Sequence, residues 1–394
     1  MPNAPLTLGI EEEYQIIDPH TRELTSYIQQ MLNQGRVVLG DQLKPEFMQS
    51  QIEVGSQICR DVHEARAEIA RLRRTVSEVA EQTGCRIVAA STHPFSRWTE
   101  QLISEGARYD DLASEMKDAA RRMLIFGMHV HLGFGRTPEA FELMIDVLNQ
   151  LRYFLPHILA LTTSSPFWHG RDTGLKSYRS LVFQNMPRSG IPPHFYGYRE
   201  YDHYVELMGR VGSLGRKPDT AKLAGQSGAG DPTKIWWDAR PHPNLGTLEV
   251  RICDMCTHID DAIAVAALIQ AIVAKLIRLR NQNQSWRIYR GVFIDENKWR
   301  AVRYGIHGDL IDFGIESEVP MRALAGEILE LVDDVVDDLG SRAEVSRIAQ
   351  IFERGTSADR QLSAYYRALD EGRSRQEALF AVVDHLVAET AQGW

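Results

Sequence analysis

Glutamate side chains stand where a buried strand is expected near the start of the chain. The segment LGIEEEYQII, residues 8–17, carries three consecutive glutamates. Because alternate side chains of a strand face opposite ways, Glu11 and Glu13 share one face beside Gly9, whereas Glu12 lies on the apolar face. Glu11 and Glu13 are either solvated carboxylates of a half-exposed strand or ligands of a cation. Glu12 needs a buried partner or a local bulge.

Two further segments place polar side chains on one face of a predicted strand. In IFGMHVHLGF, residues 125–134, His129 and His131 alternate with glycines, and the opposite face is apolar. A single histidine is more often a core residue, but an alternating pair is typical of a binding site. In GTLEVRICD, Glu249 and Arg251 share one face. They form either an internal ion pair or a metal ligand beside a cation that binds phosphate.

A fourth segment, KPEFMQSQIEVGS (residues 44–56), contributes two more glutamates, Glu46 and Glu53. Their odd separation places them on opposite faces of a regular strand, so they converge only if a bulge or break lies between them. Otherwise they are solvated. If they converge, one sheet face carries five glutamates and one histidine, namely Glu11, Glu13, Glu46, Glu53, His129 and Glu249.

Five carboxylates on one face predict a metal site. Like charges raise one another's pKa and destabilise a fold unless a cation compensates them. Ligation by many carboxylates and one imidazole favours Mg²⁺ or Mn²⁺ over zinc. Bound Mg²⁺ in turn suggests a phosphate-bearing substrate such as ATP.

The composition of the chain limits its class. Its 394 residues are 44% hydrophobic, which is enough for a sizeable core, and the net charge is −9. The chain has no dense Lys/Arg block, so a nucleic-acid binder is disfavoured. Four cysteines and the lack of a signal-peptide pattern indicate the reducing cytoplasm. The most apolar segment, residues 262–279, contains three polar residues, so we expect a buried helix rather than a membrane span.

The elements that position these residues follow from the pattern along the chain. The first part alternates strand-like runs with one long helix at about residues 62–83. Residues 164–244 are rich in Gly, Pro, aromatics and Arg, with one helical patch near 201–208, so this loop-rich region is expected to be functional or mobile. We predict a single domain over residues 1–394, with a mainly helical part from 318 to 394.

In this order, the segments resemble the glutamate–cysteine ligase type 2 family of carboxylate–amine ligases. The resemblance rests on GIEEEYQ, KPEFMQSQIEV, GMHVHLGF, SSPFWHGRDTGLKSYR, WWDARPHPNLGTLEVRICD and KWRAVRYGIHGDLID. It implies an α+β fold like the catalytic domain of glutamine synthetase: a curved antiparallel sheet with helices packed behind it, and ATP and metals on its open face. A homodimer is also implied.

The resemblance also implies roles for the polar face. Metal ligation is implied for Glu11, Glu13, Glu46, Glu53, His129 and Glu249. Contact with the transferred phosphoryl group is implied for Arg251. The implied activity joins the γ-carboxyl of glutamate to the amine of cysteine while ATP becomes ADP and phosphate. The carboxylate would attack the γ-phosphorus to give an acyl phosphate, which the amine then attacks.

Four further side chains are predicted to bind substrate. His131 lies on the polar face, Arg179 (in KSYR) and Arg240 (in WDAR) are placed to grip the substrate carboxylate, and Trp237 is placed to wall the pocket. The structural alternatives for Arg179 and Arg240 are internal ion pairs, and for Trp237 core packing. A segment of the loop-rich region is expected to close over the site and keep water from the acyl phosphate.

Several rival interpretations remain. The same ligase chemistry would serve a different amine, and a guanidino kinase on the same type of fold would stop at phosphorylation. A His-x-His hydrolase or oxygenase needs fewer carboxylates than this chain offers, and the intact ligand set argues against a non-catalytic binding protein. GQSGAGD, residues 225–231, resembles a phosphate loop only in composition. The Cys253–Cys256 motif lacks the second pair that a zinc site needs.

Overall fold

An antiparallel sheet and layers of helices make up the computed structural model, which describes residues 6–214 and 230–394. Within these residues, seven strands form the main sheet in the order β10-β11-β5-β1-β3-β2, with β4 also paired to β1. All their pairings are antiparallel. The strands are β1 (Leu8–Ile17), β2 (Leu43–Pro45), β3 (Gln51–Gly55), β4 (Arg86–Val88), β5 (Met128–Gly133), β10 (Ala239–His242) and β11 (Thr247–Val250). The α+β prediction is confirmed.

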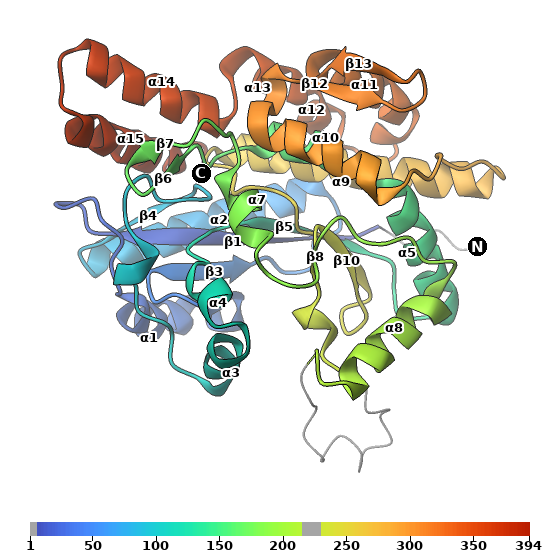
Figure 1. Ribbon diagram of the computed structural model, residues 1–394, viewed down its shortest axis with the longest axis horizontal. Coiled ribbons are helices and arrows are strands. Elements are labelled where there is room, and N and C mark those ends of the chain that lie inside the picture. Colours follow the sequence, from blue (N-terminus) through green and yellow to red (C-terminus); the bar gives the residue numbers. More distant parts are fainter. Residues whose placement is uncertain (1–5, 215–229) are drawn as a thin grey trace.

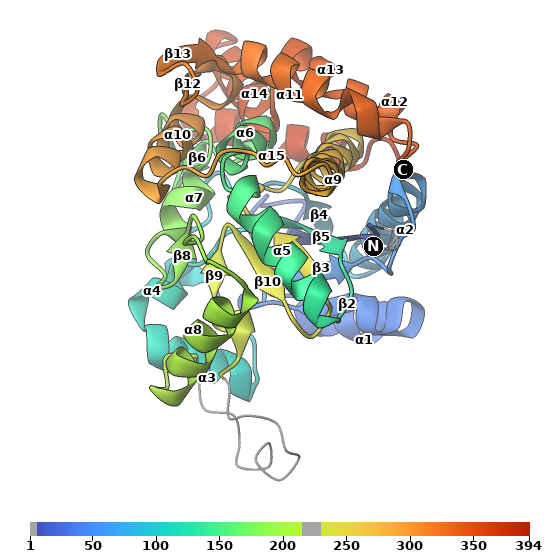
Figure 2. The same cartoon turned by 90° about the vertical axis from the view of Figure 1, so that its right-hand side faces the viewer.

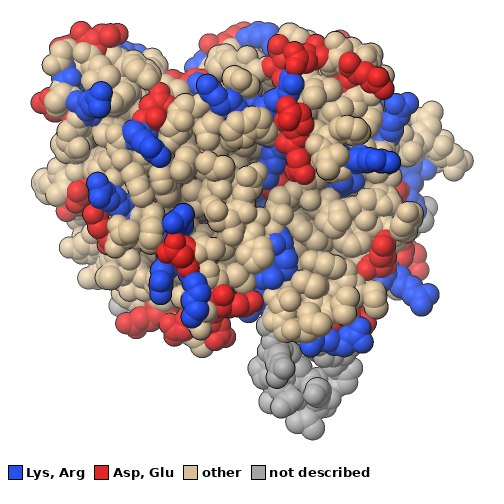
Figure 3. Space-filling view, in the orientation of Figure 1, with Lys and Arg blue, Asp and Glu red and all other residues tan. Residues whose placement is uncertain are grey.

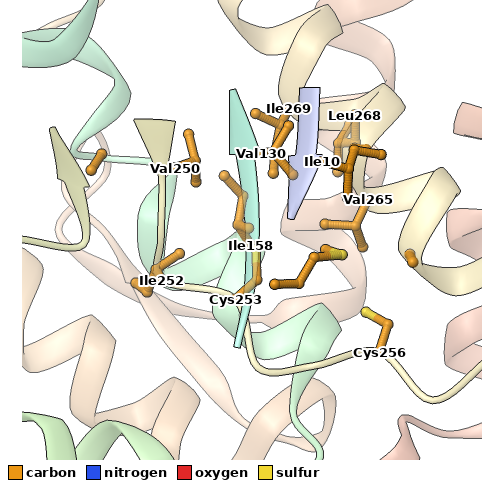
Figure 4. Close-up of a cluster of buried hydrophobic side chains, with 14 of the residues drawn as sticks. Ile10, Val130, Ile158, Val250, Ile252, Cys253, Cys256, Val265, Leu268 and Ile269 are labelled. Carbon is orange, nitrogen blue, oxygen red and sulfur yellow. The ribbon is translucent and has the colours of Figure 1, made fainter. Parts of the chain in front are cut away.

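One face of this sheet is apolar because the strands alternate as their sequences predict. Ile10 and Val130 point toward the long helix α9 (Ile259–Asn281), where Figure 4 shows them beside Val265, Leu268 and Ile269. Val250 belongs to the same hydrophobic core. Helices α2 (Val62–Gln82) and α5 (Pro138–Leu151) contact the sheet beside α9. Sequence periodicity predicted α2 to within a residue.

Helix α9 is long and apolar enough to cross a membrane by length and composition alone, but 72% of its most apolar window is buried inside the protein. Its N-cap is His258, whose side chain accepts a hydrogen bond from the Asp260 N–H. Asp260 and Asp261 lie in its first turn, where carboxylates interact favourably with the helix dipole. The segment is thus the core helix that its polar residues predicted.

Glu12, which had no partner in the sequence, lies on the apolar face opposite its neighbours. Its side chain has no exposed surface, and both its oxygens accept hydrogen bonds from Arg73 of α2, at 2.6 and 2.8 Å. The Tyr14 hydroxyl donates to the same carboxylate. Arg73 also donates to the carbonyls of Thr257 and Cys256, at 2.7 and 2.9 Å. A buried ion pair, rather than a bulge, therefore accommodates Glu12.

Most of the remaining helices lie on the covered side of the sheet, and others flank its open side (Figures 1 and 2). The N-terminal part supplies α1 (Ile28–Leu39), α3 (Ala107–Met116) and α4 (Asp118–Arg121). The side of the covered face carries α6 (Leu155–Thr162), α10 (Gly291–Tyr304), α11 (Met321–Val336), α12 (Arg342–Ser346), α13 (Ile348–Arg354), α14 (Ser357–Asp370) and α15 (Arg375–Thr390). A small hairpin, β12 (Asp309–Asp312) with β13 (Ser317–Pro320), precedes α11.

The loop-rich region contains more regular structure than its composition predicts. It holds α7 (Tyr178–Phe183) and α8 (Tyr198–Arg210). Only α8 was predicted. It also holds β10 and four two-residue strands: β6 (Phe167–Trp168), β7 (Arg171–Asp172), β8 (Ser189–Gly190) and β9 (Trp236–Trp237). Such short elements have too few residues to show a period. Most of the GQSGAGD segment, residues 225–229, lies outside the described residues.

Candidate active site

Strand register brings the predicted polar residues side by side on the open face of the sheet. Glu11 pairs with His129 of β5, and Glu13 pairs with Glu53 of β3. His131 pairs with Glu249 of β11. Paired residues on neighbouring strands lie about 5 Å apart, so side chains that the sequence separates by up to 240 positions meet here.

These side chains line a cavity of about 510 Å³, which we call the acidic cavity. Every predicted site residue except Trp237 lines it: Glu11, Glu13, Glu46, Glu53, His129, His131, Arg179, Arg240, Glu249 and Arg251. The carboxylates among them form two separate groups.

The first group, the histidine-containing cluster, consists of Glu11, His131 and Glu249, which offer ligand atoms within 4.8 Å of one another. Two arginines compensate its charge. Arg240 donates to Glu249 Oε2 at 2.8 Å, and Arg251 donates to Glu249 Oε1. Burial would raise the pKa of Glu249, but the positive charges of Arg240 and Arg251 hold it well below its usual range. This cluster is therefore ionised and partly balanced by the protein itself.

The second group, the three-glutamate cluster, consists of Glu13, Glu46 and Glu53, again with ligand atoms within 4.8 Å. Strand β2 ends at Pro45 and β3 begins at Gln51, so a turn separates Glu46 from Glu53. This is the kind of break that their convergence required. Burial and the charge of Glu53 raise the pKa of Glu13 to about 7, and burial also raises the pKa of Glu46 and Glu53.

Lys44 contacts a carboxylate of each cluster. Its ammonium lies 2.9 Å from Glu53 and 3.4 Å from Glu11. With its side chain 47% exposed, it compensates the three-glutamate cluster only partly. Sequence reasoning missed this residue, although it begins the KPEF motif in which Glu46 was noticed.

The donor set fits divalent cations. In the three-glutamate cluster, burial opposes ionisation of the carboxylates. A metal ion between them would favour their ionised form. In the histidine-containing cluster, the buried Nε2 atom of His131 has no hydrogen-bond partner among the described residues and lies 3.6 Å from Glu11 Oε2. Carboxylate oxygens with one imidazole match Mg²⁺ or Mn²⁺.

The two histidines occupy different positions in the cavity. His131 shares the first cluster with Glu249, whereas His129 Nδ1 lies 3.2 Å from Glu11 and 3.9 Å from Glu249. Burial, and then the charge of Arg251, lower the pKa of His129 to about 4, so its imidazole is neutral. A neutral imidazole is the form that ligates metals. Ligation by His129 stays a prediction, and His131 is the alternative ligand.

Both predicted substrate-binding arginines line the cavity, but their guanidinium groups already have protein partners. Besides Glu249, Arg240 donates to the carbonyls of Thr233 and Ile235, both at 2.6 Å. Arg179 donates to the carbonyls of Arg251 and Ile252 at 3.2 and 3.3 Å. Arg240 thus forms an internal ion pair, which was the alternative to substrate binding. Arg179 has no carboxylate within hydrogen-bond distance among the described residues.

Trp237 lies in the hydrophobic core, 5% exposed, where its ring packs against Tyr204 and Phe195. Its neighbour Trp236 lines the acidic cavity instead. The two belong to the short strand β9, in which successive side chains face opposite ways. The WW dipeptide indicated an aromatic wall but did not indicate which ring provides it.

Comparison with known proteins identifies the family. The model of glutamate–cysteine ligase family 2 matches residues 7–385. The chain belongs to this family. It is 52% identical over 392 residues to the protein of Herpetosiphon aurantiacus named "Putative glutamate--cysteine ligase 2", covering 100% of this chain and 95% of that protein. It is 50% identical to the protein of the same name from Roseiflexus castenholzii, covering 100% and 96%.

Solved structures share the fold of this family member. Glutamate–cysteine ligase of Francisella tularensis, in complex with AMP, is similar with a TM-score of 0.64 and 12% identity, covering 98% of this chain and 89% of that one. A bifunctional glutathione synthetase of Pasteurella multocida is similar with a TM-score of 0.60 and 15% identity, covering 98% and 52%. The protein is a carboxylate–amine ligase with a glutamine synthetase-like fold.

Proposed function

We propose that this ligase joins the γ-carboxyl of L-glutamate to the amine of L-cysteine, giving γ-glutamylcysteine while ATP becomes ADP and phosphate. The observation that carries the proposal is the pair of carboxylate clusters that line one cavity of about 510 Å³. Such a site suits metal ions bound to nucleotide phosphates. The names of the relatives and the AMP complex of the Francisella enzyme support the substrate and the nucleotide.

Mg²⁺ or Mn²⁺ would be held by the two clusters, with His129 or His131 as the imidazole ligand, and would supply charge neutralisation at the ATP phosphates. The proposed reaction then has two steps. A carboxylate oxygen of glutamate attacks the γ-phosphorus, the bond to ADP breaks, and an acyl phosphate forms. The amine attacks the acyl carbon, phosphate leaves, and the amine loses a proton.

Arg251 stabilises the transferring phosphoryl group in this proposal. It is a buried guanidinium that lines the acidic cavity and is fixed by Glu249. A preorganised donor of this kind needs no reorganisation when charge develops in the transition state. Arg179, which donates to backbone carbonyls and lies 4.0 Å from the buried Asp254 carboxylate, is the proposed ligand of the substrate carboxylate.

Water must be kept from the acyl phosphate, and the loop-rich region is the proposed cover. Four of its residues already line the acidic cavity between α8 and β10: Asp231, Thr233, Lys234 and Trp236. They follow directly on residues 215–229, which lie outside the described residues. The Trp236 ring among these lining residues supports a role in excluding solvent.

The substrate proposal is tested by ADP release with glutamate and a panel of amines and amino acids. We expect glutamate-dependent phosphate release that rises when cysteine is added, with γ-glutamylcysteine detected by mass spectrometry. Clear preference for another amine would overturn cysteine and leave the ligase class in place. A stable phosphorylated product without an amide would favour a guanidino kinase.

The nucleotide proposal is tested by calorimetric titration of ATP with and without metal. We expect tight binding in Mg²⁺ or Mn²⁺ and weak binding in EDTA, because uncompensated carboxylates repel the phosphates. Equal affinity in both conditions would rule out a metal-bridged nucleotide. As a control, the Glu68→Gln variant lacks one carboxylate outside the cavity and should keep the same metal dependence of ATP binding.

We also propose that the protein is a cytoplasmic homodimer whose partners are small molecules rather than nucleic acid or membrane. Its cysteines are buried free thiols, which suits a reducing compartment: Cys59, Cys85, Cys253 and Cys256. On the face that Figure 3 shows, acidic and basic side chains are interspersed, unlike a nucleic-acid surface. Light scattering on the purified protein tests the dimer, and a monomeric mass would exclude it.

A further inference from the structure

Three aromatic side chains line a second cavity, of about 650 Å³, which we call the aromatic cavity. They are Trp98, Trp168 and Tyr178. The rings of Trp168 and Tyr178 stack at 5.1 Å, and the imidazole of His169 stacks on Trp168 at 4.8 Å. This cavity shares no lining residue with the acidic cavity. Its volume is typical of small-molecule sites.

The charges around the aromatic cavity are mainly positive. Arg122 lines it, with its guanidinium 5.7 Å from the Trp98 ring, and no lining residue is acidic among those described. Asp118 pairs with Arg122 at 3.0 Å, but both side chains are more than half exposed, so this pair screens Arg122 weakly. Arg97 and Arg171 lie close enough to lower the pKa of His169, after burial.

His169 adds an independent sign of a ligand site. Its backbone φ of 51° is what the two-residue turn of His169 and Gly170 between β6 and β7 requires, so it carries no information about a ligand. Its Nε2 atom, however, is buried and has no hydrogen-bond partner among the described residues. A buried polar atom without a partner is one that a bound molecule would satisfy.

Helix α7 stands between the two cavities. Arg179 and Phe183 of this helix line the acidic cavity, whereas Tyr178 and Leu181 line the aromatic cavity. The Arg179 guanidinium lies 5.6 Å from the Phe183 ring and is bonded to the carbonyl of Arg251. Any molecule that packs on Tyr178 and Leu181 therefore contacts the helix that carries Arg179.

We propose that the aromatic cavity binds a small anion bearing a flat aromatic ring, and that its occupancy alters substrate binding through α7. The ring would pack on Trp98 and Tyr178, which are only partly buried, and the anionic group would pair with Arg122. An aromatic carboxylate and a nucleotide share this chemistry. The effect on substrate rests on the proposed function, whereas the site itself does not.

Calorimetry on the protein in EDTA tests the site without involving catalysis. The probes are indole-3-acetate and uridine monophosphate, with inorganic phosphate and indole as controls that lack the ring or the charge. We expect one ring-bearing anion to bind more tightly than both controls, and the two probes distinguish a carboxylate from a nucleotide. If neither probe binds, or if phosphate and indole bind equally well, the proposal fails.

Three variants test whether the probe binds in the aromatic cavity. Arg122→Ala should weaken the probe about 10-fold or more, the scale of a hydrogen bond to a charged group. Leu181→Trp should abolish binding by filling the cavity from an exposed position of α7. Arg121→Ala removes the same charge from an exposed residue outside the lining and should leave binding unchanged. An unchanged affinity in Leu181→Trp would overturn the location.

Kinetics test the coupling. In glutamate-dependent phosphate release at saturating ATP, the bound probe should change the KM for glutamate, and Leu181→Trp should lose this response. Binding without a change in KM would overturn the coupling through α7 while the site stands. If no amine supports turnover, the proposed function fails, and the calorimetric result still decides whether the site exists.

Discussion

The two carboxylate clusters of the acidic cavity differ in how the protein treats their charge. In the histidine-containing cluster, Glu249 is fixed by Arg240 and Arg251 and is held ionised. In the three-glutamate cluster, the half-exposed Lys44 is the one cation among the described residues that forms an ion pair with a carboxylate, and the pKa of Glu13 is raised to about 7. One cluster is built to be stable without metal, and the other stores like-charge repulsion that a divalent cation would relieve.

This difference has a chemical use. Carboxylates with fixed arginine partners keep their geometry, so they can position a phosphoryl-contacting group such as Arg251. Carboxylates without such partners bind a cation strongly, because the metal removes a repulsion as well as forming new bonds. Removal of single charges should therefore affect the two clusters differently.

The largest effect is expected at Glu12, the fully paired carboxylate that lies between Glu11 and Glu13 in sequence. Glu12→Gln leaves the buried Arg73 without its counter-charge and should cost about 3–5 kcal/mol of unfolding free energy in urea. Turnover per folded molecule should stay near wild type. The double variant Glu12→Leu with Arg73→Met should be far less destabilised, and a loss below about 1 kcal/mol in Glu12→Gln would contradict a buried ion pair.

Glu249→Gln should separate the two clusters. Turnover should fall by more than about 100-fold, since even residues behind metal ligands cost 10- to 100-fold. The melting temperature of the metal-free protein should also fall, because Arg240 and Arg251 lose their shared counter-charge. Glu13→Gln should likewise abolish turnover but raise the metal-free melting temperature. Circular dichroism confirms the fold, and shifts in melting temperature of the same sign in the two variants would contradict a difference between the clusters.

Arg251→Ala tests whether the balanced cluster serves catalysis or only holds the sheet together. We expect kcat to fall about 100-fold while the KM for ATP changes far less. Arg251→Lys should rescue little, because an ammonium cannot reproduce the planar fork of a guanidinium. Lower thermal stability with kcat intact per folded molecule would assign Arg251 a purely structural role.

The smallest effect is a pH dependence of the metal-free protein. Native Glu13 keeps its proton up to about pH 7, whereas the unfolded chain loses it near 4.5. The unfolded state therefore binds fewer protons in this window, and stability falls as the pH rises from about 4.5 to 7. Differential scanning calorimetry should show a melting temperature that falls between about pH 4.5 and 7. This dependence of melting temperature on pH should be weaker in Glu13→Gln and nearly absent with saturating Mg²⁺. An equal dependence of melting temperature on pH in wild type and Glu13→Gln would show that Glu13 ionises freely.

The sequence was most informative where the structure depends on local alternation. The period of two along residues 8–17 and 125–134 placed Glu11, Glu13 and the histidines on one face before any fold was known. The same logic placed Glu12 on the opposite face and required a partner for it. That partner, Arg73, lies 61 residues away on α2 and looks like any other arginine of an amphipathic helix.

Other features depended on contacts that no local pattern encodes. Glu46 and Glu53 converge only because a turn separates β2 from β3. Trp236, not Trp237, lines the acidic cavity, and Arg240 is bound to Glu249 before any substrate arrives. Helix α7 and strand β10 are too short for a detectable period, so their places came only with the fold.

The sequence by itself therefore determined the residue types, the strand faces and the family of this protein, because these follow from local side-chain alternation and from motifs in a fixed order. The tertiary structure alone decided how the carboxylates divide into two clusters and which of them receives arginine partners. The physical reason is that charge compensation depends on distances between strands and helices, and pairing across a sheet brings together residues whose separation along the chain carries no information about those distances.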